Sequence, residues 1–198
     1  MKMSGFVVKI NDIELATVSV ENLNILSVQV HGDVIGEELA ELQIFGGNYE
    51  GKESDTHLIW VSEHEITSND VIEVAFVEAA TTSYPGKTID ELHSESEEIM
   101  GPWQPVEEMF EYLSNKPKLR EKFSFELVLP SGETIHANTT NEDYSFNFTV
   151  MWKWLHPEKA TVWLSSNSLE GIEKKENGTE QAKFNLQYQQ SVKLCIGT

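Results

Sequence analysis

Residues 145–154 read Ser-Phe-Asn-Phe-Thr-Val-Met-Trp-Lys-Trp, and this stretch decides the fold class. Apolar and aromatic side chains occupy every second position, from Phe146 through Trp152 to Trp154, while polar residues fill most of the positions between them. Successive side chains of a β-strand point to opposite faces, so this alternation predicts a strand with one buried face. We therefore expect Trp152 and Trp154 to lie in a core.

A related stretch occurs 120 positions earlier, where residues 25–30 read Ile-Leu-Ser-Val-Gln-Val. Residues 40–44 match residues 160–164 with the same shift, and residues 71–76 match residues 191–196. Near the N-terminus the shift is 119, because Phe6, Val8 and Ile10 correspond to Phe125, Leu127 and Leu129. A nearly constant shift over four segments predicts an internal duplication.

Turn-forming residues divide each half into about six short alternating runs. The first half contains runs at 6–10, 13–20, 24–31, 39–45, 57–62 and 71–78. The second contains runs at 123–129, 133–139, 144–155, 160–165, 182–188 and 191–197. The sequence therefore predicts an all-β, mainly antiparallel protein with tandem duplicated β-sandwich or barrel-like domains. We expect one repeat at 1–80, an acidic helical linker at 81–122 and a second repeat at 123–198.

The linker carries two helix signals. Thr88 and Glu91 have the spacing of a capping box and predict a helix over 88–100, which Gly101-Pro102 would end. A second helix is predicted where Val106, Met109, Phe110 and Leu113 recur at helical spacing. Its apolar face is expected to pack on a β domain.

Composition excludes several classes of function. The 198 residues contain 33 Asp and Glu against 14 Lys and Arg, a net charge of −19. Such a chain should repel nucleic acids and anionic membranes. It has a single cysteine and only a three-residue apolar run near the N-terminus, which favours a cytoplasmic protein without disulfides. No signal bears on the oligomeric state.

Motifs that would define a catalytic centre are absent from the sequence. Gly46-Gly47 follows a strand without a lysine or a helix after it, so it reads as a hairpin or loop pair rather than a phosphate loop. Cys195 matches Ala75 in the other half and reads as a small packed strand residue. The histidines near carboxylates, His64 and His93, have no histidine counterpart in the other half. We therefore expect no enzyme activity, no metal site and no cofactor.

The first 80 residues hold fifteen acidic and three basic side chains, which makes them the expected contact for a basic protein. The strand that contains Trp163 should bury Ala160, Val162 and Leu164, so Trp163 should point to the opposite, outward face. An exposed tryptophan there could anchor a contact. The main hypothesis is a non-catalytic acidic interaction protein, possibly an immunity or inhibitor protein that binds a basic partner. The alternative is a β-sandwich module that binds carbohydrate or a small ligand through exposed aromatics. An enzyme with an unrecognised carboxylate or metal centre ranks third. The candidate partner-binding residues are Glu37, Glu38, Glu41, Glu50, Glu53, Asp55 and Trp163.

Overall fold

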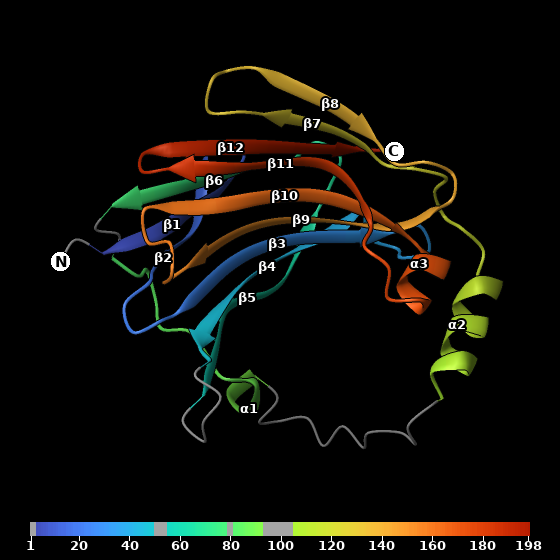
Figure 1. Ribbon diagram of the computed structural model, residues 1–198, viewed down its shortest axis with the longest axis horizontal. Coiled ribbons are helices and arrows are strands. Elements are labelled where there is room, and N and C mark those ends of the chain that lie inside the picture. Colours follow the sequence, from blue (N-terminus) through green and yellow to red (C-terminus); the bar gives the residue numbers. More distant parts are fainter. Residues whose placement is uncertain (1–2, 50–54, 79–80, 93–104) are drawn as a thin grey trace.

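The computed structural model describes residues 3–49, 55–78, 81–92 and 105–198. Within these ranges, the segments in which apolar and polar residues alternate form β-strands. The strands form two six-stranded antiparallel sheets packed face to face, as Figure 1 shows. In spatial order, sheet A contains β2 (Ile13–Ser19), β1 (Ser4–Ile10), β6 (Val71–Glu78), β12 (Gln190–Gly197), β7 (Ser124–Val128) and β8 (Thr134–Asn138). Sheet B contains β11 (Thr179–Gln187), β10 (Lys159–Ser168), β9 (Asp143–Lys153), β3 (Ile25–Asp33), β4 (Ala40–Asn48) and β5 (Thr56–Ile66). The prediction of an all-β antiparallel sandwich is confirmed.

The core lies between the sheets and consists of the inward half of each alternating strand. Phe146 of sheet B meets Phe123 and Phe125 edge to face, with centroids 4.7 and 4.9 Å apart. Each fully buried side chain of this size contributes roughly 1.5–3 kcal/mol relative to exposure. The alternation therefore fixes which face of each sheet is buried and which remains free for contacts.

Of the two tryptophans expected in the core, only Trp152 is there, at 4% exposure. Trp154 is 59% exposed, so that prediction was wrong. The strand β9 ends at Lys153, and Trp154 lies in the turn to β10. There the backbone N–H of Trp154 donates to the Asn24 carbonyl at 2.9 Å. Side chains in a turn no longer follow the period of two.

The two halves use the same pairing register. Val28 lies opposite Ile44 in the first half, and Phe148 lies opposite Leu164 in the second, each residue 120 positions further on. The two halves meet at Gln29 and Thr149, which are themselves 120 positions apart and pair directly with each other. This is the arrangement that an internal duplication would produce, and common descent of the halves stays a prediction.

Sheet A repeats the pattern with the shorter shift near the N-terminus. Phe6 pairs with Phe76 in the first half, and Phe125 pairs with Ile196 in the second. Phe125 lies 119 positions after Phe6, and Ile196 lies 120 positions after Phe76, the same two shifts that the sequence shows. Each sheet therefore takes three strands from each half, with β6–β12 and β3–β9 joining them at the centre. The proposed domain boundaries fall between β6 and β7 and remain a prediction.

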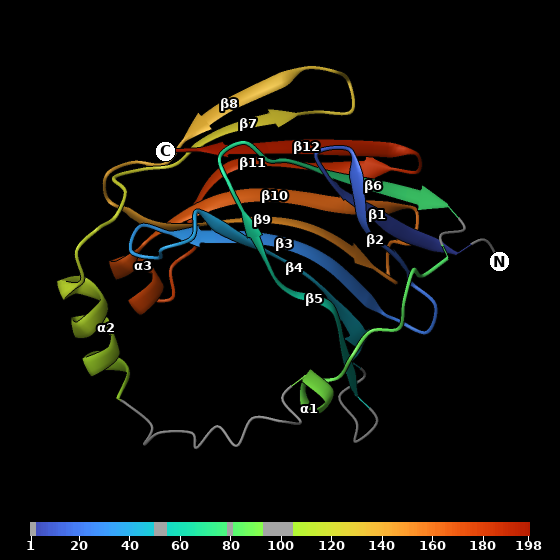
Figure 2. The same cartoon turned by 180° about the vertical axis from the view of Figure 1, so that it is seen from behind.

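Residues 81–92 cover the edges of both sheets at one side of the sandwich (Figure 2). Ser83 exchanges hydrogen bonds with Thr17 at the β2 edge, and Lys87 forms a β-bridge with Ile59 on β5. The helix α1 (Ile89–Leu92) follows, with the predicted capping box between Thr88 and Glu91. The continuation of the predicted helix beyond 92 lies outside the described residues.

The second predicted helix is α2 (Val106–Asn115), and it lies beyond α3 (Leu169–Glu173) on the side of sheet B (Figure 1). Phe110 is its buried residue, whereas Val106 and Met109 are 46% and 42% exposed. Its apolar face is therefore covered only in part. Across the described residues no helix has the length and apolar character needed to cross a membrane.

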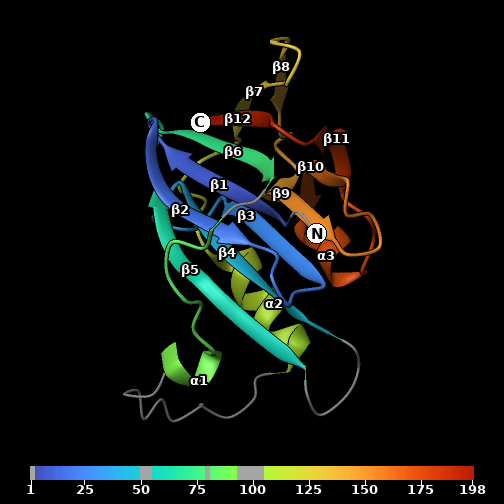
Figure 3. The same cartoon turned by 90° about the vertical axis from the view of Figure 1, so that its left-hand side faces the viewer.

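At the far end of sheet A, the β7–β8 hairpin extends away from the rest of the molecule (Figure 3). At the other sheet, Gly46 and Gly47 lie inside β4 rather than in the predicted hairpin or loop. A Cβ on Gly47 would stand 2.0 Å from the Thr56 carbonyl oxygen, and one on Gly46 would stand 2.7 Å from the Ile25 carbonyl. The doublet therefore permits close approach of β3 and β5 to β4.

Candidate ligand-binding site

The outer face of sheet B carries a line of side chains that crosses five neighbouring strands. We call it the central row; in order its members are Lys183, Trp163, Thr149, Gln29 and Gln43, each directly paired with the next. All five alternate with core residues and so face away from sheet A. The predictions of outward orientation and exposure for Trp163 are confirmed, since 41% of its surface is exposed.

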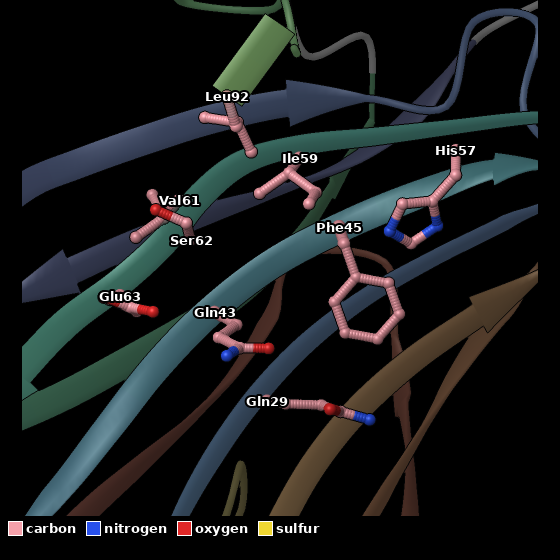
Figure 4. A pocket seen from close by; sticks show the side chains of 9 residues that line it. All are labelled: Gln29, Gln43, Phe45, His57, Ile59, Val61, Ser62, Glu63 and Leu92. Atoms are coloured by element: carbon pink, nitrogen blue, oxygen red, sulfur yellow. The ribbon is translucent and has the colours of Figure 1, made fainter. Parts of the chain in front are cut away.

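A pocket of about 470 Å³ opens at the β5 end of the central row. Figure 4 shows Gln29 and Gln43 on its floor beside Phe45, with His57 on β5 facing them and Leu92 of α1 opposite. The remaining lining residues come from β5 and are Ile59, Val61, Ser62 and Glu63. The pocket thus combines amide groups, which both donate and accept hydrogen bonds, with aromatic and aliphatic surface.

A β-bulge shapes this pocket. The β4–β5 register shifts between Leu42 and Ile44, so Gln43 has no single partner on β5 and instead shares the pocket with Ser62 and Glu63. Bulges commonly redirect side chains at functional sites. Here the irregular pairing places one hydroxyl and one carboxylate at the rim, both exposed.

One side of the pocket is built by an aromatic pair. The rings of Phe45 and His57 lie 5.7 Å apart at 35°, and the Tyr49 hydroxyl hydrogen-bonds the Nδ1 atom of His57. Burial, and second the nearby Asp55 carboxylate, raises the pKa of Tyr49. The phenol therefore stays protonated at neutral pH and remains available as a hydrogen-bonding group that orients the imidazole.

At the opposite end of the central row, Lys183 lies over the ring of Trp163, with its Nζ atom 5.3 Å from the centroid. The ammonium group also lies 3.8 Å from Glu180. One face of the indole is thus already engaged in a cation–π contact. A ligand reaching Trp163 meets an aromatic edge and face beside a positive charge.

Ser27 lies on the same outer face of sheet B. Its cross-strand partners are Phe45 on β4 and Met151 on β9. It is fully buried, and its hydroxyl has no hydrogen-bond partner within the described ranges. A buried polar group left without a partner costs roughly 1–3 kcal/mol.

The structure separates the partner-binding residues predicted from sequence. Glu41 lies one row from the pocket, paired with Glu65, and Asp55 is at the β5 end near Tyr49. Glu37 and Glu38 lie in the β3–β4 loop, at the opposite end of β4 from Asp55. Glu50 and Glu53 lie outside the described residues. Of the candidate residues that the structure describes, Trp163 belongs to the central row and Glu41 lies one row from it.

The acidic β3–β4 loop already receives a basic side chain. The Arg120 guanidinium donates to the Asp33 carbonyl at 2.6 Å and to the Glu37 carbonyl at 3.2 Å. The Leu119 N–H donates to the Val34 carbonyl at 2.7 Å. The segment after α2 therefore holds this loop in place through its backbone carbonyls.

Of the other residues singled out in the sequence, Cys195 lies on β12 and is half-buried. Burial raises the pKa of the Cys195 thiol, and the nearby Glu126 carboxylate raises it further. The Lys193 ammonium group lowers this pKa by a smaller amount. A raised pKa favours the thiol over the reactive thiolate at neutral pH. Within residues 3–49, 55–78, 81–92 and 105–198, no three His, Cys, Asp or Glu side chains form a group that could hold a metal ion. His93 lies outside these ranges.

Sequence reasoning missed the pocket residues Gln29, Gln43, Phe45 and His57. The available signal was Phe45, a large aromatic side chain at an outward position of a strand whose inward positions are Leu42 and Ile44. The fold and this site together define an antiparallel β-sandwich with a polar, aromatic-containing outer face and a pocket. Comparison with protein-family models, curated proteins and solved structures found no match to the chain.

Proposed function

We propose that this protein is a non-catalytic binding module that holds carbohydrate or another small polar ligand on the outer face of sheet B. The observation that carries the proposal is the pocket of about 470 Å³ at the end of the central row. Pockets of a few hundred Å³ that combine apolar surface with a few convergent polar groups are the usual form of small-molecule sites.

The charges around the pocket favour an uncharged ligand. Among the described residues no Lys or Arg lines the pocket, and Glu63 lies at its rim, where its carboxylate would repel an anion. At the other end of the row, Lys183 would repel a cation from Trp163. Gln29 and Gln43 can each donate and accept, which suits hydroxyl groups.

The test is ligand screening with matched variants. An array of neutral mono- and oligosaccharides is probed with the wild-type protein, Gln29→Ala, Gln43→Ala and the control Gln187→Ala. Gln187 is an exposed glutamine of β11, outside the pocket. We expect the two pocket variants to lose about tenfold or more in affinity, because each loses hydrogen bonds to a desolvated ligand. Equal binding by all four proteins would reject the pocket as the site.

A second candidate function is the docking of a basic protein, as in an immunity or inhibitor protein. Glu41 and Glu65 lie directly opposite each other on β4 and β5, and Glu38 borders the same end of the sheet. Like charges in direct cross-strand register are destabilising, and a basic partner would relieve the repulsion. The chain's charge of −19 would speed such an encounter.

Salt dependence separates the two candidates. Capture of a basic protein should weaken at high salt and be abolished in Glu38→Lys and Glu41→Lys, while Glu133→Lys on the β7–β8 turn serves as control. Binding of a neutral ligand should be nearly independent of salt and of all three charge reversals. A partner retained equally by every variant would contradict the acidic docking surface.

A further inference from the structure

The central row continues well beyond the pocket. Trp163 is three strands from Gln43, and neighbouring strands lie 4.7–4.9 Å apart, so the two side chains are separated by roughly 14 Å along the sheet. Thr149 and Gln29 lie between them in direct register. Thr149 is buried at 9% exposure, so the accessible groups of the row are Trp163 at one end and Gln29 and Gln43 at the other, spread over a distance longer than one small ligand.

The rows on either side of the central row are also mostly polar. On one side, Thr161 and Asn185 hydrogen-bond each other at 3.1 Å beside Trp163. On the other, Asn147 accepts from Thr149 at 3.1 Å and pairs in register with His31. Because these groups are held by the sheet and by each other, they form a preorganised surface.

We propose that the ligand is a linear, neutral oligosaccharide that lies across the strands, with one end in the pocket and a later unit against Trp163. This inference rests on the proposed function and adds the class and length of the ligand. Sugars present hydroxyl groups at their rims and C–H groups on their ring faces. Amide and hydroxyl side chains match the former, and the amphipathic indole matches the latter.

A peptide fits the row less well. A basic segment would meet Lys183, whose ammonium group already lies over the Trp163 ring, and an acidic segment would meet Glu63 at the pocket. A strand-forming peptide would need free backbone groups at a sheet edge. Apart from Lys183 on the edge strand β11, the central row instead lies on the interior strands β10, β9, β3 and β4.

The geometry assigns separate tasks to the two ends of the row. The pocket should provide the affinity for a short sugar, and Trp163 should act only on longer chains that reach it. Removing Trp163 should therefore weaken the binding of chains long enough to reach it and leave shorter chains almost unaffected. Removing Gln43 should weaken short and long sugars alike.

The experiment measures affinity by titration calorimetry for the mono-, di-, tetra- and hexasaccharides of cellulose, xylan, mannan and starch. For the series that binds, we expect the hexasaccharide to bind about tenfold more tightly than the disaccharide. Trp163→Ala should remove most of that gain and change disaccharide affinity less than about twofold. Trp154→Ala, which removes an exposed tryptophan of the β9–β10 turn, is the control and should leave every affinity unchanged.

Two results would overturn the proposal, and they differ in what else they reject. If mono-, di- and hexasaccharides bind equally, or if Trp163→Ala weakens all lengths by the same factor, the extended site is wrong while the pocket function stands. If no sugar of any series binds to the folded wild-type protein, both the inference and the carbohydrate form of the proposed function are rejected.

Discussion

At the scale of single residues, two buried serines of sheet B, Ser27 and Ser166, differ in whether their hydroxyl has a hydrogen-bond partner. The Ser27 hydroxyl is buried without a partner in the described chain, whereas the equally buried Ser166 accepts a hydrogen bond from Gln181 at 3.3 Å. We expect Ser27→Ala to leave stability unchanged or to raise it by about 1 kcal/mol, because no hydrogen bond is lost. Ser166→Ala should lower it by about 1 kcal/mol. Urea unfolding of both variants measures the difference, and a large loss in Ser27→Ala would contradict this account.

Asp70 predicts a pH dependence. Burial alone raises its pKa, but hydrogen bonds from the Thr67 N–H, the Thr67 hydroxyl and the Asn11 amide, together with the nearby His64 side chain, outweigh that effect and lower it. A carboxyl with a lowered pKa in the folded state stabilises the fold above its unfolded pKa, and this contribution is lost as the pH falls through the folded value. Stability of the wild type should therefore drop more between pH 5 and about pH 2 than that of Asp70→Asn. Parallel pH slopes in chemical unfolding would reject this role of Asp70.

At the scale of strands, Gly47 tests how closely β4 approaches its neighbours. A Cβ at this position meets the Thr56 carbonyl at 2.0 Å, and a backbone atom cannot move aside as a flexible side chain can. We expect Gly47→Ala to cost about 1–3 kcal/mol through overpacking. Gly36→Ala, where the nearest atom is an Asp33 carboxylate oxygen at 3.3 Å, should change stability by less than about 0.5 kcal/mol. Thermal unfolding compares the two, and equal effects would show that β4 can shift.

The strands were predictable from sequence because alternation is a local property. The runs at 6–10, 71–78 and 191–197 correspond to β1, β6 and β12 with bounds that differ by two residues or fewer. The wrong placement of Trp154 shows where this local rule stops, since the period continues into residues that a turn removes from the strand.

The pocket could not be predicted in the same way. Gln29 and Thr149 come together only because β3 pairs with β9 across the two halves, and Ser62 and Glu63 reach Gln43 only through a bulge. Pairing between distant strands and bulges carry no period in the sequence. Trp163 could be predicted to face outward, but its alignment with Gln43 needed the sheet order.

At the scale of the whole molecule, the shared sheets make the halves mutually dependent. Without residues 1–80, β12 would lose β6 and β9 would lose β3, which exposes two central strands as long apolar edges. We expect residues 123–198 alone to lack a cooperative unfolding transition and to aggregate, and mixing with residues 1–80 to restore the sandwich. Circular dichroism and NMR dispersion test this. A separately folded half would contradict the dependence and support two autonomous domains.

The central claim is that the outer face of sheet B binds the ligand. The most direct test is a map of backbone amide chemical shifts in the ¹⁵N-labelled protein during titration with the tightest-binding oligosaccharide. We expect the largest changes at Gln29, Gln43, Thr149 and Trp163, together with the indole N–H of Trp163. Changes confined to sheet A, to the β7–β8 hairpin or to the acidic β3–β4 loop would contradict it.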